Sequence, residues 1–299
     1  KKVTANKPAA AKTTVRTLSA DPKPASIAKA SSEKIGTGKV QLPVNIINIV
    51  LAELFGTFIL TLVALATFQD SGALYVGIAL SLLVLTVGAV SGAHVNPAVT
   101  FGLWSMRKLK TILVPFYWGA QFLGAMLAVI ATNWVANSSI SLSFGDFAKL
   151  DWSVFGAEMV AAAVFLFGLA AVVTRAELSV GARAAGIGAS LAIGLVVGGT
   201  LLTALKAQDV ANYQKAYQAT QSSEGAKGPA IPHSAFIKGV TANPAVALAV
   251  TDTAANKLDP SVDDSKTNSR LTLEVILGTL VGAAVGGNLY LLIAGRRKN

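Results

Sequence analysis

The chain of 299 residues contains no cysteine, only two histidines and few charged residues. The absence of cysteine excludes disulfides and thiolate metal sites. Charged residues make up 13% of the chain, whereas a soluble domain carries about 25%. Hydrophobic residues make up 53% of the chain, and its mean hydropathy is +0.58. This composition indicates a protein whose main solvent is the lipid bilayer.

Residue clusters that carry catalysis or bind metals are also missing. His94 and His233 are far apart in the sequence, and neither has a set of metal-ligating residues around it. No nucleophile–base pair, phosphate-binding loop or nucleotide motif is present. We therefore expect a protein that is not an enzyme and needs neither a cofactor nor a metal.

The formal charge of +10 raises the question of nucleic-acid binding, but the distribution of the charge argues against it. Residues 1–43 mix lysine with alanine, proline, serine and threonine, a composition that cannot bury a core. No aromatic residues alternate with the lysines, as they do in many single-strand binders. We predict a disordered basic tail over residues 1–43, which could also lie near anionic lipid, and no nucleic-acid partner.

Long apolar segments dominate the rest of the chain. A bilayer span needs about 20 apolar residues. The segments long enough to cross are 46–68, 73–90, 111–136, 154–174, 184–205 and 271–294. Two further apolar pieces, 98–106 and 244–250, are too short to cross alone. Two polar inserts, 206–238 and 251–270, are interpreted as flexible surface loops, with a lid or docking surface as the alternative.

The distribution of lysine and arginine predicts the orientation of these spans, because cytoplasmic loops carry an excess of both. With six spans the two termini lie on the same side of the membrane. That side collects most of the 25 basic residues. We predict a multi-pass protein of the cell membrane with both termini in the cytoplasm and both polar inserts outside.

The sequence reads as two copies of one pattern. The first span contains "AELFGTFIL" and the fourth contains "AEMVAAAVF", so that Glu53 and Glu158 each follow an alanine in an apolar segment. Each half then runs span, span, Asn-Pro-Ala, short helix, span. Because three spans is an odd number, the second half must be inverted in the bilayer. The predicted fold is an all-α membrane protein with six transmembrane helices plus two half-helices in an inverted repeat.

The two Asn-Pro-Ala motifs predict how the half-helices begin. Asparagine is a favoured N-cap, and proline suits the first helical position. Two half-helices meeting at the midplane bring together two positive dipole ends, each of about half an elementary charge. Backbone at that depth must line a cavity or be buried in protein. The pattern predicts a narrow pore for neutral, hydrogen-bonding molecules, with these residues at its midplane: Asn96, Pro97, Ala98, Asn243, Pro244 and Ala245.

The carboxylates of the two repeats need a structural reason, because a charge inside a span costs about 3 kcal/mol or more. We expect Glu53 and Glu158 to accept hydrogen bonds from the irregular backbone just before each half-helix. A proton relay is the alternative, but no histidine or arginine lies in the spans as a relay partner. Glu274, near the end of the last span, is expected at the membrane interface.

The motifs "AELFGTF", "SGAHVNPAVT" and the second Asn-Pro-Ala resemble the major intrinsic proteins, the aquaporins and aquaglyceroporins. The resemblance covers roughly residues 44–295, which we take as the channel domain. It implies a homotetramer with one pore per subunit and a narrow outer filter of four positions. The residues that it implies for this filter are Val76, Thr200 or Leu201, Val240 and Val246.

The sequence departs from the family at this filter. The family usually has arginine directly after the second Asn-Pro-Ala, where this chain has Val246, and its water-selective members usually have histidine and phenylalanine at two other positions. We expect a wider and more apolar opening, with cation exclusion dependent on the midplane dipoles. An apolar constriction can also dewet and conduct water poorly.

The sequence therefore predicts a passive channel for small uncharged solutes such as glycerol-like polyols, and for water. A water-selective channel, a secondary transporter and a membrane scaffold are the alternatives. The expected partners are lipid, further copies of the chain, water and small neutral solutes. We expect His94 to donate or accept a hydrogen bond in the cytoplasmic vestibule, with a pH gate as the alternative, and His233 to be solvated.

Overall fold

The structure is a computed structural model, and it describes residues 42–67, 72–140, 142–221, 228–253 and 267–295. Almost all of the predicted tail, residues 1–43, lies outside the described residues. The same is true of residues 254–266 in the second polar insert.

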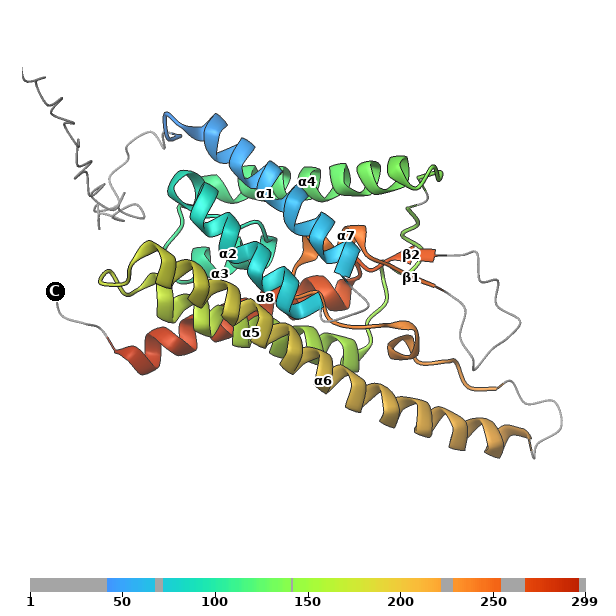
Figure 1. Ribbon diagram of the computed structural model, residues 1–299. Helices are drawn as coiled ribbons and strands as arrows, with labels where there is room; N and C mark the ends of the chain where they lie inside the picture. Colours follow the sequence, from blue (N-terminus) through green and yellow to red (C-terminus); the bar gives the residue numbers. More distant parts are fainter. Residues whose placement is uncertain (1–41, 68–71, 141, 222–227, 254–266, 296–299) are drawn as a thin grey trace, which may run out of the picture.

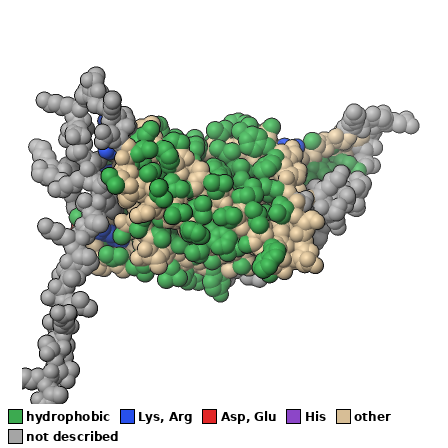
Figure 2. Space-filling view, turned by 90° about the horizontal axis from the view of Figure 1, so that it is seen from above, with side chains coloured by type: hydrophobic (Ala, Val, Ile, Leu, Met, Phe, Trp, Pro, Cys, Tyr) green, Lys and Arg blue, Asp and Glu red, His purple; other side chains and the backbone are tan. Residues whose placement is uncertain are grey.

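Within the described residues, six long helices form the body of the molecule, and each is long and apolar enough to cross a membrane. They are α1 (Ile46–Thr67), α2 (Gly72–Ser91), α4 (Val114–Val135), α5 (Trp152–Val173), α6 (Val180–Gln221) and α8 (Leu273–Ala294). A 3₁₀ turn, η1 (Thr111–Leu113), leads into α4. Figure 2 shows hydrophobic side chains covering the middle of the molecule, with lysine and arginine towards its ends. The prediction of a multi-pass membrane protein is confirmed.

Two short helices lie inside this bundle: α3 (Pro97–Ser105) and α7 (Pro244–Ala249). At 1.5 Å per residue they measure about 14 Å and 9 Å, which is far less than the ~30 Å hydrocarbon core. Figure 1 places α3 towards the end of the bundle where α8 finishes, and α7 towards the end that carries strands β1 and β2. The two half-helices therefore approach from opposite ends, as the inverted repeat predicts.

The packing of the helices repeats between the two halves. Helix α1 packs against α2 and α4, and α5 packs in the same way against α6 and α8. The short helices are exchanged between the halves, because α3 contacts α8 while α7 contacts α4. This reciprocal exchange is what a two-fold relation between the halves produces, and it brings the N-termini of α3 and α7 to the centre.

Glycines allow the central helices to approach closely. Gly282 and Gly286 of α8, and Gly194 and Gly198 of α6, all lie directly against backbone carbonyl oxygens of α5. A Cβ atom at any of these positions would collide with that backbone. The four-residue spacing of these glycines therefore serves packing within one bundle.

The first polar insert is helical over half of its length, so its interpretation as a flexible loop is wrong there. Helix α6 continues without a break to Gln221, well past the predicted end of the fifth span at residue 205. Residues 206–221 contain no glycine or proline and are rich in the good helix formers alanine, lysine and glutamine. Figure 1 shows this end of α6 extending beyond the other helices. A 3₁₀ turn, η2 (His233–Phe236), follows in the same insert.

The second insert contains a small antiparallel sheet of β1 (Thr251–Thr253) and β2 (Thr267–Ser269). Thr251 pairs with Ser269 in this sheet, and directly after it the Arg270 N–H donates to the Val250 carbonyl at 2.9 Å. These bonds return the chain to the C-terminal end of α7 before α8 begins.

Candidate functional site: two opposed helix caps

The two Asn-Pro-Ala motifs cap the half-helices as their sequence suggests. Asn96 has extended backbone angles, and its Oδ1 accepts from the Ala98 N–H at 2.8 Å. Asn243 Oδ1 accepts from the N–H of Ala245 at 3.0 Å and of Val246 at 3.4 Å. Pro97 and Pro244 stand at the first turn of α3 and α7, where a missing N–H removes no bond.

The two caps are joined directly to each other's loops. Asn96 Nδ2 donates to the Ala242 carbonyl at 2.9 Å, and Asn243 Nδ2 donates to the Val95 carbonyl at 3.1 Å. Each asparagine amide carries two hydrogens, so one hydrogen on each remains for another acceptor. The side chains are almost fully enclosed, since Asn96 is 2% exposed and Asn243 is 3% exposed.

Glu53 braces the loop that leads into α3. Its Oε1 accepts from the His94 N–H at 2.9 Å and from the Ser91 hydroxyl at 2.6 Å. Its Oε2 accepts from the Val95 N–H at 2.7 Å and from Gln121 Nε2 at 2.8 Å. Val95 has φ 44°, a value that costs energy for a β-branched residue. The carboxylate bonds help to hold the chain in this conformation.

Glu158 does the same for the loop that leads into α7. It accepts from the N–H of Thr241 at 2.8 Å and of Ala242 at 2.7 Å, and from the Thr241 hydroxyl at 3.1 Å. Ala242 has φ 49° and precedes Asn243 as Val95 precedes Asn96. A cation also lies close, because an Arg270 guanidinium nitrogen is 3.8 Å from Glu158 Oε1. We did not predict Arg270 from the sequence, although it stands directly before the last span, next to an acidic stretch.

His94 lies in the same loop as Asn96 but is held by protein groups. Its ring Nδ1 is 3.1 Å from the Thr100 hydroxyl of α3, and its ring lies 4.4 Å from the Tyr117 ring between centroids. The side chain is buried. The hydrogen-bonding role expected of His94 is therefore directed at the half-helix itself.

A cavity of about 140 Å³ adjoins Asn243 and is mostly apolar. Val76, Val240 and Val246, three of the implied filter residues, line it together. Thr200 and Leu201 are not among its lining residues, and Thr200 is exposed. The cavity is lined instead by the following residues of α6: Leu191, Leu195 and Gly199. Positions four apart share one face of a helix, so the face of α6 turned to the cavity is the one that carries these residues.

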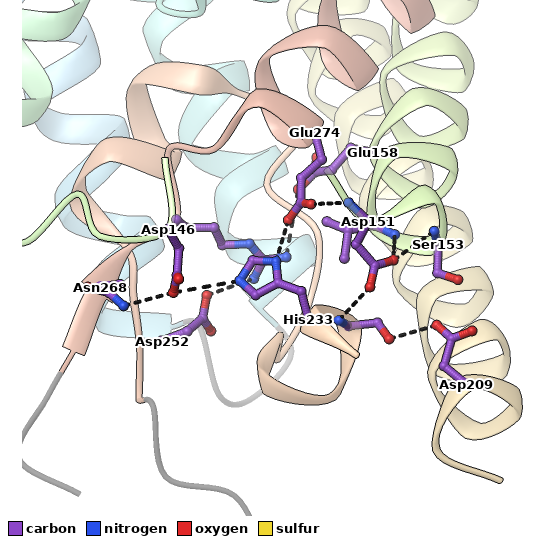
Figure 3. A network of polar contacts seen from close by, with 12 residues as sticks. Asp146, Asp151, Ser153, Glu158, Asp209, His233, Asp252, Asn268 and Glu274 are labelled. Atoms are coloured by element: carbon purple, nitrogen blue, oxygen red, sulfur yellow. Dashed lines mark hydrogen bonds and ion pairs between the residues drawn. The ribbon is translucent and has the colours of Figure 1, made fainter. Parts of the chain in front are cut away.

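Two further expectations are corrected at the end of the molecule that carries η2. Glu274, expected at the interface, is fully buried, and His233, expected in solvent, has a side chain only 12% exposed. His233 Nδ1 lies 2.7 Å from Glu274 Oε1. The Ser234 N–H donates to Asp151 Oδ2 at 2.9 Å, which ties η2 to the N-cap of α5. Figure 3 shows these residues converging from α5, α8 and η2.

Comparisons with known proteins find similar sequences and a similar structure. Residues 69–210 match the family model described as Major intrinsic protein. Aquaporin NIP2-3 of Zea mays is 34% identical over 121 residues, which are 40% of this chain and 38% of that protein. Aquaporin Z of Photorhabdus laumondii is 34% identical over 140 residues, 38% of this chain and 61% of that protein. The aquaglyceroporin from Plasmodium falciparum aligns with a TM-score of 0.48 and 19% identity over 84% of this chain and 96% of that one.

In the described part of the chain, six helices that are long and apolar enough to span a membrane surround two capped half-helices, which defines a polytopic α-helical membrane protein. Residues 69–210 of the chain are similar to the major intrinsic protein family. The matched part spans 38% of the first of these relatives and 61% of the second. The expectation that the chain is not an enzyme agrees with this family.

Proposed function

We propose that the chain is a passive channel for small uncharged solutes of the glycerol type and for water, which pass beside Asn96 and Asn243. The observation that carries the proposal is the pair of caps. Each asparagine uses its oxygen on its own half-helix and one amide hydrogen on the opposite loop. The second amide hydrogen of each remains as a donor for an oxygen atom of a passing molecule.

The same arrangement disfavours cations. The positive ends of α3 and α7 meet where the caps exchange hydrogen bonds, and each end is equivalent to roughly half an elementary charge. A cation at this point would meet two like partial charges, whereas a neutral acceptor is attracted. The discrimination follows from the backbone and needs no charged side chain.

The cavity next to Asn243 favours a solute with CH groups. Its walls include Val76, Val240, Val246 and Leu195, and the position usually occupied by arginine in the family is Val246. An apolar wall contacts carbon atoms favourably and leaves hydroxyl groups to the polar groups of Thr241 and Asn243. This preference distinguishes the proposal from a water-selective channel.

We further propose a homotetramer in the cell membrane with both termini in the cytoplasm. The excess of lysine and arginine on the side of the termini supports the orientation. Large apolar side chains cover the outer faces of the bundle, among them Leu51, Phe55, Leu85 and Leu289. Lipid or neighbouring copies of the chain would cover these faces.

The proposal is tested by stopped-flow flux measurements on proteoliposomes with water, glycerol and urea side by side. The unchanged chain is expected to pass glycerol with a flux linear in its gradient. Val246→Arg is expected to lower glycerol flux more than water flux, with Val246→Leu as the control for bulk. Unchanged glycerol flux in Val246→Arg would refute the filter assignment. Saturating flux would indicate a transporter, water flux alone a water channel, and no flux a scaffold.

A further inference from the structure

A second cavity, of about 230 Å³, lies at the end of the molecule that carries η2 and the small sheet. Its lining residues include Arg270, Asp252, Thr272, Asp146 and Lys149, and none of its lining residues also lines the cavity next to Asn243. A single water molecule requires about 10–15 Å³ of cavity volume, so the second cavity has room for a small molecule. We call it the Arg270 cavity.

Arg270 is the most unusual side chain in this cavity. Its side chain is 0% exposed, and none of its three guanidinium nitrogens has a hydrogen-bond partner within the described part of the chain. The nearest carboxylate oxygens belong to Asp252 at 3.7 Å and Glu158 at 3.8 Å. These distances exceed the 2.7–3.2 Å of a hydrogen bond. Guanidinium has five N–H donors, and buried donors without acceptors are costly, so the site favours an occupant with an acceptor oxygen.

Two other groups that line the cavity also lack hydrogen-bond partners among the described residues. Both carboxylate oxygens of Asp252 are buried and accept no hydrogen bond there, and the Thr272 hydroxyl makes none. Thr272 is 1% exposed and stands at the N-cap of α8 without a side-chain capping bond. The cavity therefore presents unpartnered donors and unpartnered acceptors close together.

The charges around the cavity select the kind of occupant. Arg270 and Lys149 are balanced by Asp252 and Asp146 in the lining. Asp146 Oδ2 lies 3.8 Å from His233 Nε2 (Figure 3), and Asp252 Oδ2 lies 3.7 Å from an Arg270 guanidinium nitrogen. An anion would meet these carboxylates, and a cation would meet the buried guanidinium. The described residues contain no group of three side chains suited to a metal ion. A neutral molecule that both donates and accepts hydrogen bonds satisfies all of these groups.

We propose that the Arg270 cavity is a binding site for a small uncharged polyol or amide, separate from the cavity next to Asn243. Hydroxyl or carbonyl oxygens of the occupant accept from Arg270. Hydroxyl or amide hydrogens donate to Asp252, and the Thr272 hydroxyl completes the set. The site exists whether or not the chain conducts, because no lining residue is shared with the proposed conduction path.

Equilibrium binding of glycerol to the purified full chain in nanodiscs tests the proposal, with saturation-transfer NMR as the readout. The expected result is a saturable signal. Thr272→Val is the first variant, because it keeps the shape of the side chain and breaks no hydrogen bond of the described protein. It is expected to weaken glycerol binding about fivefold, which is the effect of one lost hydrogen bond. Asp252→Asn is the second variant, with a loss of similar size expected.

Two controls separate this site from others. Thr251→Val changes an exposed threonine next to Asp252 and is expected to leave binding unchanged. Val246→Trp fills the cavity next to Asn243 and is expected to leave the signal of the Arg270 cavity in place. Inorganic phosphate is expected not to displace glycerol.

Each of the following results would overturn the proposal. The first is a signal that grows linearly with glycerol concentration, which would mean that the cavity holds water only. The second is equal glycerol affinity in the unchanged chain, Thr272→Val and Asp252→Asn, or a saturable signal that Val246→Trp abolishes. The third is displacement of glycerol by phosphate, which would mean an anion site. A failure of conduction in proteoliposomes with normal glycerol binding would refute the channel proposal and leave this one standing.

Discussion

Glu53 and Glu158 accept similar backbone hydrogen bonds, but replacing each by glutamine is predicted to change the stability of the protein to different extents. We expect Glu158→Gln to destabilise the protein more than Glu53→Gln. Both substitutions keep the size and shape of the side chain, so that the difference reports on hydrogen bonds and charge. The contacts of each carboxylate set the expected magnitude.

Glutamine at position 53 loses one backbone bond. Each oxygen of Glu53 accepts one backbone N–H, from His94 or Val95, and one side-chain donor, from Ser91 or Gln121. Replacing one oxygen by NH₂ leaves one of the two backbone N–H groups facing a donor. The Ser91 hydroxyl and the Gln121 amide can turn to accept from the new NH₂ group. The net cost is one unsatisfied buried N–H, about 1–3 kcal/mol.

Glutamine at position 158 loses the same backbone bond and also the attraction between the carboxylate and Arg270. One backbone N–H, of Thr241 or Ala242, would face the new NH₂ group. In addition, the Arg270 guanidinium at 3.8 Å loses one of its two carboxylates. Two unit charges at this distance attract by about 4 kcal/mol at an effective dielectric constant of 20. The remaining carboxylate of Asp252 offsets about half of this. The extra cost is about 2 kcal/mol.

Thermal unfolding of the detergent-solubilised protein, followed by fluorescence at one fixed heating rate, measures the difference. For a chain of this size, about 2 kcal/mol corresponds to a separation of about 4–8 °C between the two variants. Glu177→Gln, at an exposed position, is the control and should leave the midpoint unchanged. Equal midpoints for Glu53→Gln and Glu158→Gln, or a lower one for Glu53→Gln, would refute the role assigned to Arg270.

Two further predictions concern packing and the η2 segment. Gly286→Leu places a side chain against the backbone of α5 and is expected to abolish the peak of folded protein in size-exclusion chromatography. The control Gly156→Leu, at an open position, should be tolerated. Equal yields of folded protein from the two variants would contradict the packing. Ser234→Ala removes the 2.7 Å hydrogen bond to Asp209 and should raise the rate of amide hydrogen exchange over residues 231–237. Ser138→Ala, at an exposed position, is the control. An unchanged exchange rate would show that this bond does not hold η2 in place.

Much of the fold could be predicted because its determinants are local or periodic. A membrane span is recognised from the length of its apolar run. The Asn-Pro pair marks the start of a helix, because asparagine caps the first turn and proline fits the first helical position. The repeat of Ala-Glu in the first and fourth spans then implied the inverted pairing that the helix contacts display. The end of α6 was missed because a polar segment without glycine or proline can be either a loop or an exposed helix.

The positions of Arg270, His233 and Glu274 could not be predicted, because their burial depends on contacts made far along the chain. Glu274 is covered by η2 and by the start of α5, segments 41 and 123 residues away in sequence. Hydropathy assigns a single glutamate at the end of a span to the interface unless the covering segment is known. The absence of Thr200 and Leu201 from the lining of the cavity next to Asn243 has another cause, since a gap-free alignment across a long insert cannot specify which face of α6 turns inward.

The buried Arg270 does not replace the arginine that the family usually has at the position of Val246. Arg270 lines a different cavity from Val246, and it lies between two carboxylates, Glu158 and Asp252, at 3.8 Å and 3.7 Å. Its charge is therefore compensated locally and projects little field into the cavity next to Asn243. In the proposed channel, rejection of cations then depends on the ends of α3 and α7 alone. A neutral, apolar outer cavity with its polar groups confined to the two caps follows from this separation, and it is the arrangement that a solute with both hydroxyl and CH groups requires.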